Sequence, residues 1–408
     1  MVDVREAITR AHHDEWARVV AALTKRFGDL DIAEEAAAEA FATAVERWPT
    51  DGVPPNPGAW LTTTANHRAI DRIRRETKRD DKQKQAQMLY DDDPPEPLGA
   101  IDDERLRLVF TCCHPALAMD ARIALTLRMV GGLTVPEIAR AFVVQPTTME
   151  RRITRAKAKI KAARIPYRVP SADDLPVRVS GVLAVLYLVF NEGYLATGAD
   201  TDPVRADLTA EAIRLTRLVR ALLPSDSEVA GLLALMLLIE ARRTARISAS
   251  GELVTLDEQD RGAWDAALVA EGHRLVRDRL AIGVAPGRYQ ILAAINAVHT
   301  SARDVRDTDW SQVVALYDQL VQLDPSPIIA LNRAIAVAEL DGPEVALATI
   351  DRLDDKLAGY HAYHATRADL LRRLGRSEQA RAAYDKAIEL AGNTAETANL
   401  TRRRDQLG

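Results

Sequence analysis

The stretch from Gly132 to Lys161 reads GLTVPEIARAFVVQPTTMERRITRAKAKIK, and it determines how this part of the chain folds. An apolar helical face is broken at residues 143–146, and a second helix is predicted to start at Thr147, with Glu150 at the spacing of a capping box. This second helix has one apolar and one basic face. Two short helices with a tight turn are typical of a DNA-binding helix-turn-helix, although an ordinary helical hairpin with a solvated basic face has the same pattern.

A second basic segment, from Trp60 to Arg75, follows a breaker run at residues 54–58. It combines an aromatic ring, an amide and a cluster of guanidinium groups on one predicted helix. Unpaired bases stack on aromatic rings or bond to amides, and arginines hold the phosphate backbone, so this mixture favours binding of a single DNA strand. The alternative is a solvated helix with Trp60 in the core.

In this order, the two segments and an earlier helix resemble the extracytoplasmic-function (ECF) sigma factors of the bacterial sigma-70 class. Residues 33–41 with Trp48 resemble the helix that binds core RNA polymerase, residues 60–75 the helix that melts and reads the −10 element, and residues 133–157 the −35 helix-turn-helix. The family usually has Asp and Gln in the first motif, where this chain has Glu35 and Ala38.

The resemblance implies three sets of site residues and two partners, core RNA polymerase and promoter DNA. The predicted polymerase contacts are Glu34, Glu35, Glu39 and Phe41. The predicted −10 contacts are Trp60, Asn66, His67, Arg68, Arg72, Arg74 and Arg75. The predicted −35 contacts are Thr147, Thr148, Arg151, Arg152, Arg155 and Lys157, with Thr148, Arg151 and Arg152 as the readers of base edges.

The formal net charge of −5 does not exclude DNA binding, because the charges are segregated along the chain. Basic residues dominate 147–168 and acidic residues dominate 91–104. The N-terminus has no secretory core, and the apolar runs Val182–Phe190 and Leu232–Ile239 are too short to span a bilayer, so we expect a cytoplasmic protein without a membrane partner.

Cys112, Cys113 and His114 could form a metal or redox site, but the preceding apolar run favours a buried helix end. We therefore expect no metal, no cofactor and no catalytic residue. An enzyme in residues 177–300 is an alternative of another class. Its candidate site is a cluster of Asn191, Glu192, Glu211, Glu240, Arg242, Asp260 and Arg261, but such polar and charged residues more often act as helix caps and ion pairs.

The composition and the long periodic runs predict an all-α protein. The predicted organisation is a first helical domain at 1–80, an acidic linker at 81–104, the helix-turn-helix domain at 105–168, a helical extension at 177–300 and repeats at 310–408. The linker is either a solvated tether or, as the resemblance implies, a mimic of RNA through Asp91–Asp93 in the RNA-exit path of polymerase.

The repeats are indicated by Tyr317, Ile350 and Tyr384, whose spacings of 33 and 34 residues resemble tetratricopeptide repeats. Such arrays bind peptides or partner domains, although this one could simply cover the preceding domain. The whole chain resembles a branch of the ECF sigma factors with such an extension, through the motifs at 191–194, 259–261 and 331–334, and the branch implies control by the fused domain. The other interpretation is a helix-turn-helix regulator with a repeat sensor, which would need neither a strand-melting helix nor a polymerase-binding helix.

Overall fold

A computed structural model describes residues 4–79, 104–142, 144–194, 205–248, 253–281, 283–392 and 394–407. The fold is 78% helical, and the described ranges contain no strand beyond an isolated bridge between Ile247 and Leu253. The all-α prediction is thus confirmed. The chain divides into two compact units, Met1–Val189 and Phe190–Gly408, which are described separately. The predicted linker, with Asp91–Asp93, lies outside the described residues, except for its last residue, Glu104.

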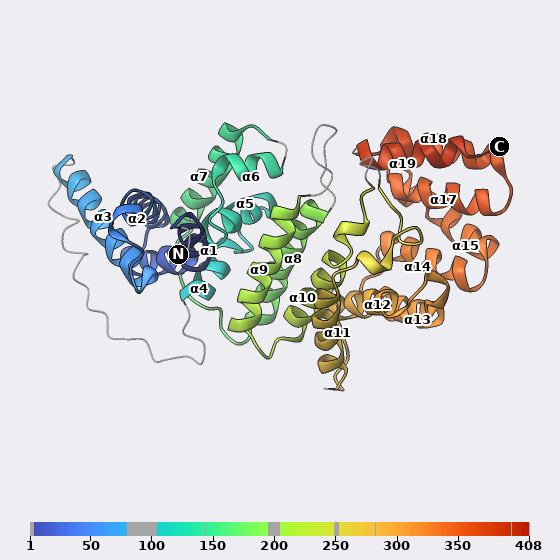
Figure 1. The fold of residues 1–408 in the computed structure, drawn as a ribbon, viewed down its shortest axis with the longest axis horizontal. Coiled ribbons are helices and arrows are strands. Elements are labelled where there is room, and N and C mark those ends of the chain that lie inside the picture. Colours follow the sequence, from blue (N-terminus) through green and yellow to red (C-terminus); the bar gives the residue numbers. More distant parts are fainter. Residues whose placement is uncertain are drawn as a thin grey trace. The chain divides into compact units, whose positions relative to one another are not determined.

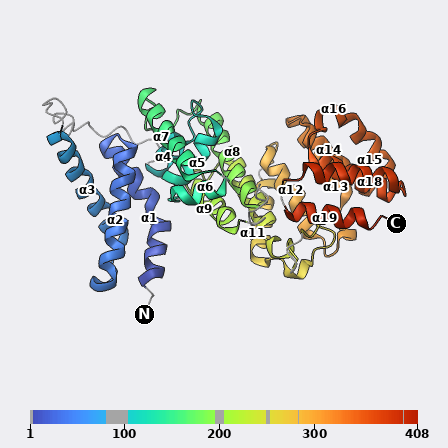
Figure 2. The same cartoon turned by 90° about the horizontal axis from the view of Figure 1, so that it is seen from above.

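The first unit begins with three packed helices, α1 (Val4–Phe27), α2 (Leu30–Asp51) and α3 (Pro57–Arg79), which lie side by side in Figure 2. Asp29 caps α2 by accepting hydrogen bonds from the backbone amides of Asp31 and Ile32. Trp48 is fully buried, and its ring meets that of Trp60 edge to face at 5.5 Å. The core of this bundle thus fixes the orientation of α3 relative to α2.

Four shorter helices follow, α4 (Glu104–Cys112), α5 (Met119–Met129), α6 (Val135–Ala141) and α7 (Pro146–Ala162), with α5 and α6 packed on α7. The predicted capping box at Thr147 and Glu150 is wrong. Helix α7 begins at Pro146 without a side-chain cap, and the capping box lies instead at Thr134 and Glu137, where it starts α6. Proline fits this first position because it has no amide hydrogen to satisfy there.

Helix α8 (Leu175–Tyr194) runs across the boundary between the units. With 20 residues and a mean hydropathy of 1.4, it is the one helix in the described part of the chain that is long and apolar enough to cross a membrane, a test that core helices also pass. Most of its large apolar residues are buried: Val179, Val182, Leu183, Val185, Leu186, Val189 and Phe190.

The second unit continues with α9 (Ala206–Leu222), α10 (Ser227–Glu240), α11 (Ala266–Leu280) and α12 (Arg288–Ser301) (Figure 1). Helix α10 is buried over residues 229–238 and packs against α9, α11 and α12. Short 3-10 turns occur at Arg243–Ala245, Arg261–Ala263, Val305–Asp307 and Asp351–Leu353.

The last part of the chain forms successive helix pairs. They are α13 (Trp310–Leu323) with α14 (Pro327–Leu340), α15 (Pro343–Ile350) with α17 (His361–Arg373), and α18 (Ser377–Leu390) with α19 (Thr394–Asp405); the short α16 (Asp354–Leu357) precedes α17. Ala334 and Ala368 lie on the second helices of the first two pairs and are fully buried. The 34-residue period of the sequence thus corresponds to one helix pair.

Candidate nucleic-acid interface

The first half of α7 presents a polar face to solvent. Thr147, Thr148, Arg151 and Arg155 are exposed, while the opposite face, with Met149 and its helical neighbours, is buried. Hydroxyl and guanidinium groups at the start of a recognition helix are suited to base edges and phosphates. Arg152 differs, because its half-buried guanidinium lies 3.7 Å from Asp120 of α5.

The second half of α7 has a different environment. Lys157 is buried, and its ammonium group lies 2.8 Å from the carboxylate of Asp31 and forms a short contact with Glu34. Arg128 of α5 donates to the other oxygen of Glu34 at 2.5 Å. The structure therefore brings together Lys157, predicted to bind DNA, and Glu34, predicted to bind polymerase.

Further bonds join the same surfaces. Lys161 pairs with Asp29 at 3.0 Å, and the indole of Trp16 donates to the carbonyls of Arg128 and Met129 at 3.2 and 3.1 Å. We call this surface the α2–α7 contact, formed by Trp16, Asp29, Asp31 and Glu34 on one side and Arg128, Lys157 and Lys161 on the other. Nothing local in the sequence marked Trp16 or Arg128, because both act through residues more than 90 positions away.

Glycine is required at the edge of the α2–α7 contact. Gly132 has a φ of +77°, and a Cβ atom there would lie 2.8 Å from His12 Cε1 and 3.0 Å from Trp16 Cγ. A larger residue would thus act as a wedge. Gly28 has a similar φ of +65° but nothing within 4 Å of its Cβ position, which makes it a matched control for backbone strain.

The charge of Glu34 depends on this contact. Burial raises the pKa of its carboxyl, but Lys157 and Arg128 outweigh that effect and hold the pKa below its ordinary value of 4.5. The carboxylate is therefore charged at neutral pH, as a buried ion pair requires.

The predicted −10 residues lie along α3, where Trp60 and Asn66 are half-buried and His67, Arg74 and Arg75 are exposed. The side-chain oxygen of Asn66 is buried and accepts no hydrogen bond from the described residues. This acceptor is unused, and a base could reach it only once the side chain turns outward.

The other two arginines of the predicted −10 set, Arg68 and Arg72, are held by α2. Arg68 lies 3.8 Å from Glu39 and donates to Thr43 at 3.2 Å, and Arg72 pairs with Glu35. Glu39 and Glu35, which are predicted to bind polymerase, are thus paired with arginines that are predicted to bind DNA. The predicted polymerase contact Phe41 lies in the core, with its ring 5.7 Å from that of Trp16 and 5.0 Å from that of His12.

The two adjacent cysteines are buried at the end of α4. Burial raises the pKa of both thiols, that of Cys113 to about 11, and Cys113 lies 3.3 Å from the hydroxyl of Thr126. Within the described ranges, no group of three or more His, Cys, Asp or Glu residues could hold a metal ion. The pair thus has the surroundings of core residues.

The charged residues proposed for an enzyme have separate local roles. Glu211 pairs with Arg214 at 2.8 Å, Glu240 pairs with Arg243 at 2.7 Å, and Asp260 caps a 3-10 turn. Two more bond elsewhere: Arg242 donates to Asn296, and Arg261 donates to the carbonyls of His299 and Ala302. These contacts hold helix ends together.

The motif at 191–194 is also structural. Gly193 allows α8 to approach α9, because a Cβ atom there would lie 2.6 Å from the backbone nitrogen of Thr209. The guanidinium of Arg246 stacks over the ring of Tyr194, 3.2 Å from its centroid, and donates to its carbonyl. Both residues thus stabilise the start of the second unit.

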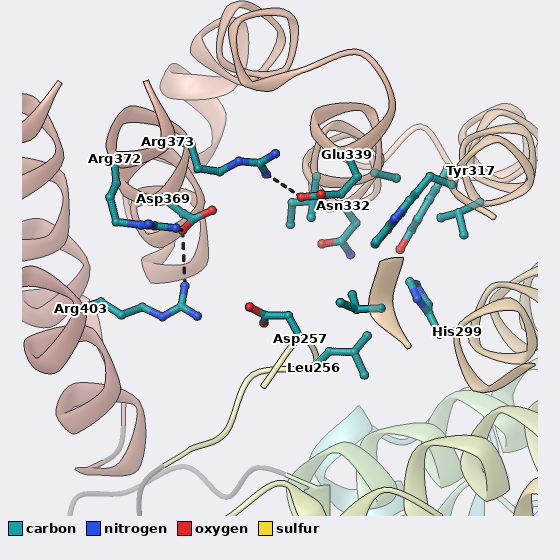
Figure 3. A pocket seen from close by; sticks show the side chains of 15 residues that line it. Leu256, Asp257, His299, Tyr317, Asn332, Glu339, Asp369, Arg372, Arg373 and Arg403 are labelled. Carbon is teal, nitrogen blue, oxygen red and sulfur yellow. Dashed lines mark hydrogen bonds and ion pairs between the residues drawn. The ribbon is translucent and has the colours of Figure 1, made fainter. Parts of the chain in front are cut away.

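A cavity of about 590 Å³ opens among the helix pairs of the second unit (Figure 3). Its apolar lining includes Leu256, Val305, Trp310, Val313 and Ile335. Its charged lining includes two ion pairs that Figure 3 shows as dashed lines, Arg373 with Glu339 at 2.5 Å and Arg403 with Asp369 at 3.4 Å. A cavity lined by both apolar and charged side chains is suited to a peptide.

Comparison with known families identifies the first unit. Residues 11–79, which span most of α1 to α3, match sigma-70 region 2, and residues 107–160, from α4 to α7, match sigma-70 region 4. The chain belongs to the sigma-70 family. Residues 178–280 of this sigma-70 protein match a family of unknown function, DUF6596, and the predicted domain limits and the repeats from 310 stay predictions.

Two similar proteins match different lengths of the sigma-70 chain. An uncharacterized protein of Rhizobium meliloti is 43% identical over 397 residues, which are 96% of this chain and 93% of the relative. The ECF RNA polymerase sigma factor SigK of Mycobacterium ulcerans is 28% identical over 159 residues, which are 37% of this chain and 82% of that protein. No solved structure matches the chain.

Proposed function

We propose that this sigma-70 protein is a sigma factor of the ECF type, which directs core RNA polymerase to promoters in the cytoplasm. In this proposal α2 binds polymerase, α3 melts and reads the −10 element and α7 reads the −35 element. The observation that carries it is the exposed face of α7, with Thr148 and Arg151, in the same unit as the α2–α3 pair. Sigma-70 proteins are initiation factors, and RNA synthesis itself belongs to polymerase.

The proposal gives the α2–α7 contact a role. Elements centred near positions −10 and −35 are separated by about 25 base pairs, or about 85 Å of B-DNA. A chain with Lys157 buried against Glu34 cannot place α3 and α7 on both elements. We therefore propose that the contact keeps the free protein closed, and that polymerase and promoter separate its two sides.

Opening would also release the predicted contacts that are now engaged. Lys157 would become available to DNA phosphates and Glu34 to polymerase. Arg152 could reach a base only after leaving Asp120, so Thr148 and Arg151 are the first readers in this proposal.

The second half of the chain is proposed to control the first and to bind a protein partner. Similarity over 96% of the chain to the Rhizobium meliloti protein supports a function for both halves together. The cavity in Figure 3 supports a peptide partner that places an apolar side chain near Ile335 and polar groups near Arg403.

Reconstitution tests the proposed function. The purified chain is mixed with bacterial core polymerase and genomic DNA fragments, and the transcript starts and permanganate-reactive thymines are mapped. We expect starts preceded by a shared −10 and −35 sequence, with melting at −10. Asn66→Ala should reduce melting more than closed-complex binding, because its free acceptor serves an unpaired base.

DNA binding without polymerase, together with transcript starts no different from those of core polymerase alone, would instead favour a helix-turn-helix regulator. Equal loss of closed binding and melting in Asn66→Ala would remove Asn66 from the −10 set.

Control by the second half is tested by truncation. A chain that ends after Arg168 should still bind −35 DNA, which serves as the control for folding, but should give a different transcript yield in cell extract. Ile335→Glu in the full chain should change the yield in the same direction if a partner occupies the cavity. Identical yields from all three proteins would make the second half a passive extension.

A further inference from the structure

A short turn in the connection between α10 and α11 lies against the last helix pairs of the second unit. It comprises Thr255–Glu258 and is closed by a hydrogen bond of 2.9 Å from the amide of Glu258 to the carbonyl of Thr255. The amide of Val254 donates to the carbonyl of Arg246 at 2.7 Å, and the side-chain nitrogen of Gln259 donates to the carbonyl of Val254 at 3.1 Å. The 255–258 turn therefore stands on an anchored base.

Arginines of α19 hold the tip of this turn. Arg402 and Arg403 lie 3.2 and 3.6 Å from the two carboxylate oxygens of Glu258, and Arg403 also donates to the hydroxyl of Thr255 at 3.0 Å. Glu258 is exposed, and ion pairs of exposed side chains contribute little to stability. These contacts are therefore of a kind that a competing carboxylate can replace.

The 255–258 turn lies where two cavities adjoin. Leu256 and Asp257 line the cavity of about 590 Å³ together with the apolar Trp310 and Val313, and Figure 3 shows Leu256 and Asp257 reaching into it. Thr255 lines a second cavity of about 310 Å³. The two cavities form one longer groove, the α14–α19 groove, because they share Ile335, Glu339, Asp369, Arg373 and Arg403. The turn occupies only part of this groove.

The charges around the α14–α19 groove favour an acidic occupant. In Figure 3 the carboxylate of Asp257 and the guanidinium of Arg403 point toward one another. His299 adds no charge at neutral pH, because burial lowers its pKa to about 4. The helices that line the groove or hold the turn contribute four arginines and two acids, and the turn adds two more acids: Arg372, Arg373, Arg402 and Arg403 face Glu339 and Asp369 with Asp257 and Glu258. Without the turn, the groove therefore has an excess of positive charge.

We propose that the α14–α19 groove binds an acidic segment of a partner protein, in which an apolar residue precedes two acids, and that the 255–258 turn is its built-in competitor. The turn itself has this pattern in Leu256, Asp257 and Glu258. A partner segment of the same chemistry replaces the ion pairs of the turn and, being longer, fills both cavities. The inference rests on the proposed function in one respect, namely that a partner's peptide enters the cavity of Figure 3.

A competitor within the same chain has a measurable effect. A tethered segment is present at an effective concentration of about millimolar, so it weakens the binding of an added peptide without contacting that peptide. Removing the contacts that the turn makes with the groove should therefore raise the affinity for the peptide.

Fluorescence anisotropy of the full chain with a labelled peptide that copies residues 253–260 tests the proposal. Leu256→Ser with Glu258→Gln weakens the chain's own turn, and this variant should bind the peptide at least fivefold tighter than the unmodified chain does. It should also bind the peptide at least tenfold tighter than a neutral version with Asn and Gln in place of the acids. Leu280→Ser with Glu378→Gln changes exposed residues outside the groove and is the matched control, with the affinity of the unmodified chain.

Arg403→Gln, added to the variant with the weakened turn, removes a guanidinium that both occupants use and should cancel the gain in affinity. An unchanged helical circular-dichroism spectrum is the control for folding. Equal affinity for the acidic and neutral peptides, no gain when the turn is weakened, or no binding by that variant at millimolar peptide would each overturn the proposal. Tighter binding of an RNA oligonucleotide than of the acidic peptide would overturn it in favour of a nucleic acid. Because neither polymerase nor promoter DNA is present, failure here is distinct from failure of sigma activity.

Discussion

The two halves of α7 carry the same kind of side chain but have opposite surroundings. Arg151 and Arg155 in the first half are exposed to solvent, whereas Lys157 in the second half is buried against Asp31 and Glu34. The difference shows that a basic helical face is not one functional surface. Exposed positions such as Arg151 and Lys159 are open to a partner, whereas Lys157 is used by the protein itself.

The largest expected effect comes from removing the shared acid of the α2–α7 contact. Glu34→Ala leaves the half-buried Arg128 without a carboxylate and the buried Lys157 with Asp31 alone, so we expect a loss of about 3–5 kcal/mol in the free energy of unfolding. Urea denaturation followed by tryptophan fluorescence measures it. Glu46→Ala, on the exposed surface of α2, is the control, and an equal loss in both variants would contradict the assignment.

The same acid predicts a pH dependence. Because the pKa of Glu34 is lower in the folded protein than in the unfolded chain, its contribution is fully present above the ordinary value of 4.5 and is lost as the pH falls through the folded pKa. The stability difference between the unmodified chain and Glu34→Ala should therefore shrink below about pH 4.5.

A wedge at the edge of the contact should have the next largest effect. Gly132→Ala brings a Cβ atom within 3 Å of His12 and should cost about 1–3 kcal/mol more than Gly28→Ala, which meets nothing. Both variants carry the strain of a positive φ, so thermal or urea unfolding of the pair isolates the clash. An equal loss of stability in the two variants would contradict the close packing of Gly132 against α1.

The exposed half of α7 should determine promoter choice. Arg151→Ala should weaken binding to the cognate −35 sequence by about 1–3 kcal/mol and relax specificity at one base pair. Lys159→Ala, also exposed on α7, should weaken binding to all sequences alike. Competition binding against a library of −35 variants would separate these effects, and unchanged sequence preference in Arg151→Ala would refute its role as a reader.

The smallest effect is expected at the rim of the contact. The side chain of Lys161 is 81% exposed where it pairs with Asp29, so Lys161→Ala should lower the free energy of unfolding by less than about 1 kcal/mol. A larger loss in the same urea experiment would mean that this exposed pair stabilises the contact as strongly as the buried pairs do.

Local patterns predicted the helices, and their limits have physical causes. The periodicity of residues 149–160 gave the correct buried face of α7, because a helix repeats its contacts every three to four residues. The predicted start of α7 at Thr147 was wrong by one residue, because Pro146 begins the helix without any side-chain cap.

The partner of each charge could not be predicted in the same way. Lys157 and Arg155 look alike in sequence, and only folding brings Glu34, 123 positions away, against one of them. In the sequence, Phe41 likewise fits an exposed binding motif and a core position equally well. Only the structure, which packs Trp16 beside it, shows that it lies in the core. Non-local contacts of this kind have no local signal.

The central claim is that the α2–α7 contact closes the free protein and opens on the promoter. Spin labels at Arg10→Cys and Ala163→Cys, both exposed, report the distance between its sides by pulsed electron resonance, and the buried Cys112 and Cys113 stay unlabelled. We expect a single short distance in the free chain and a distance longer by tens of ångströms with core polymerase and promoter DNA. The same short distance in a transcribing complex would contradict the account.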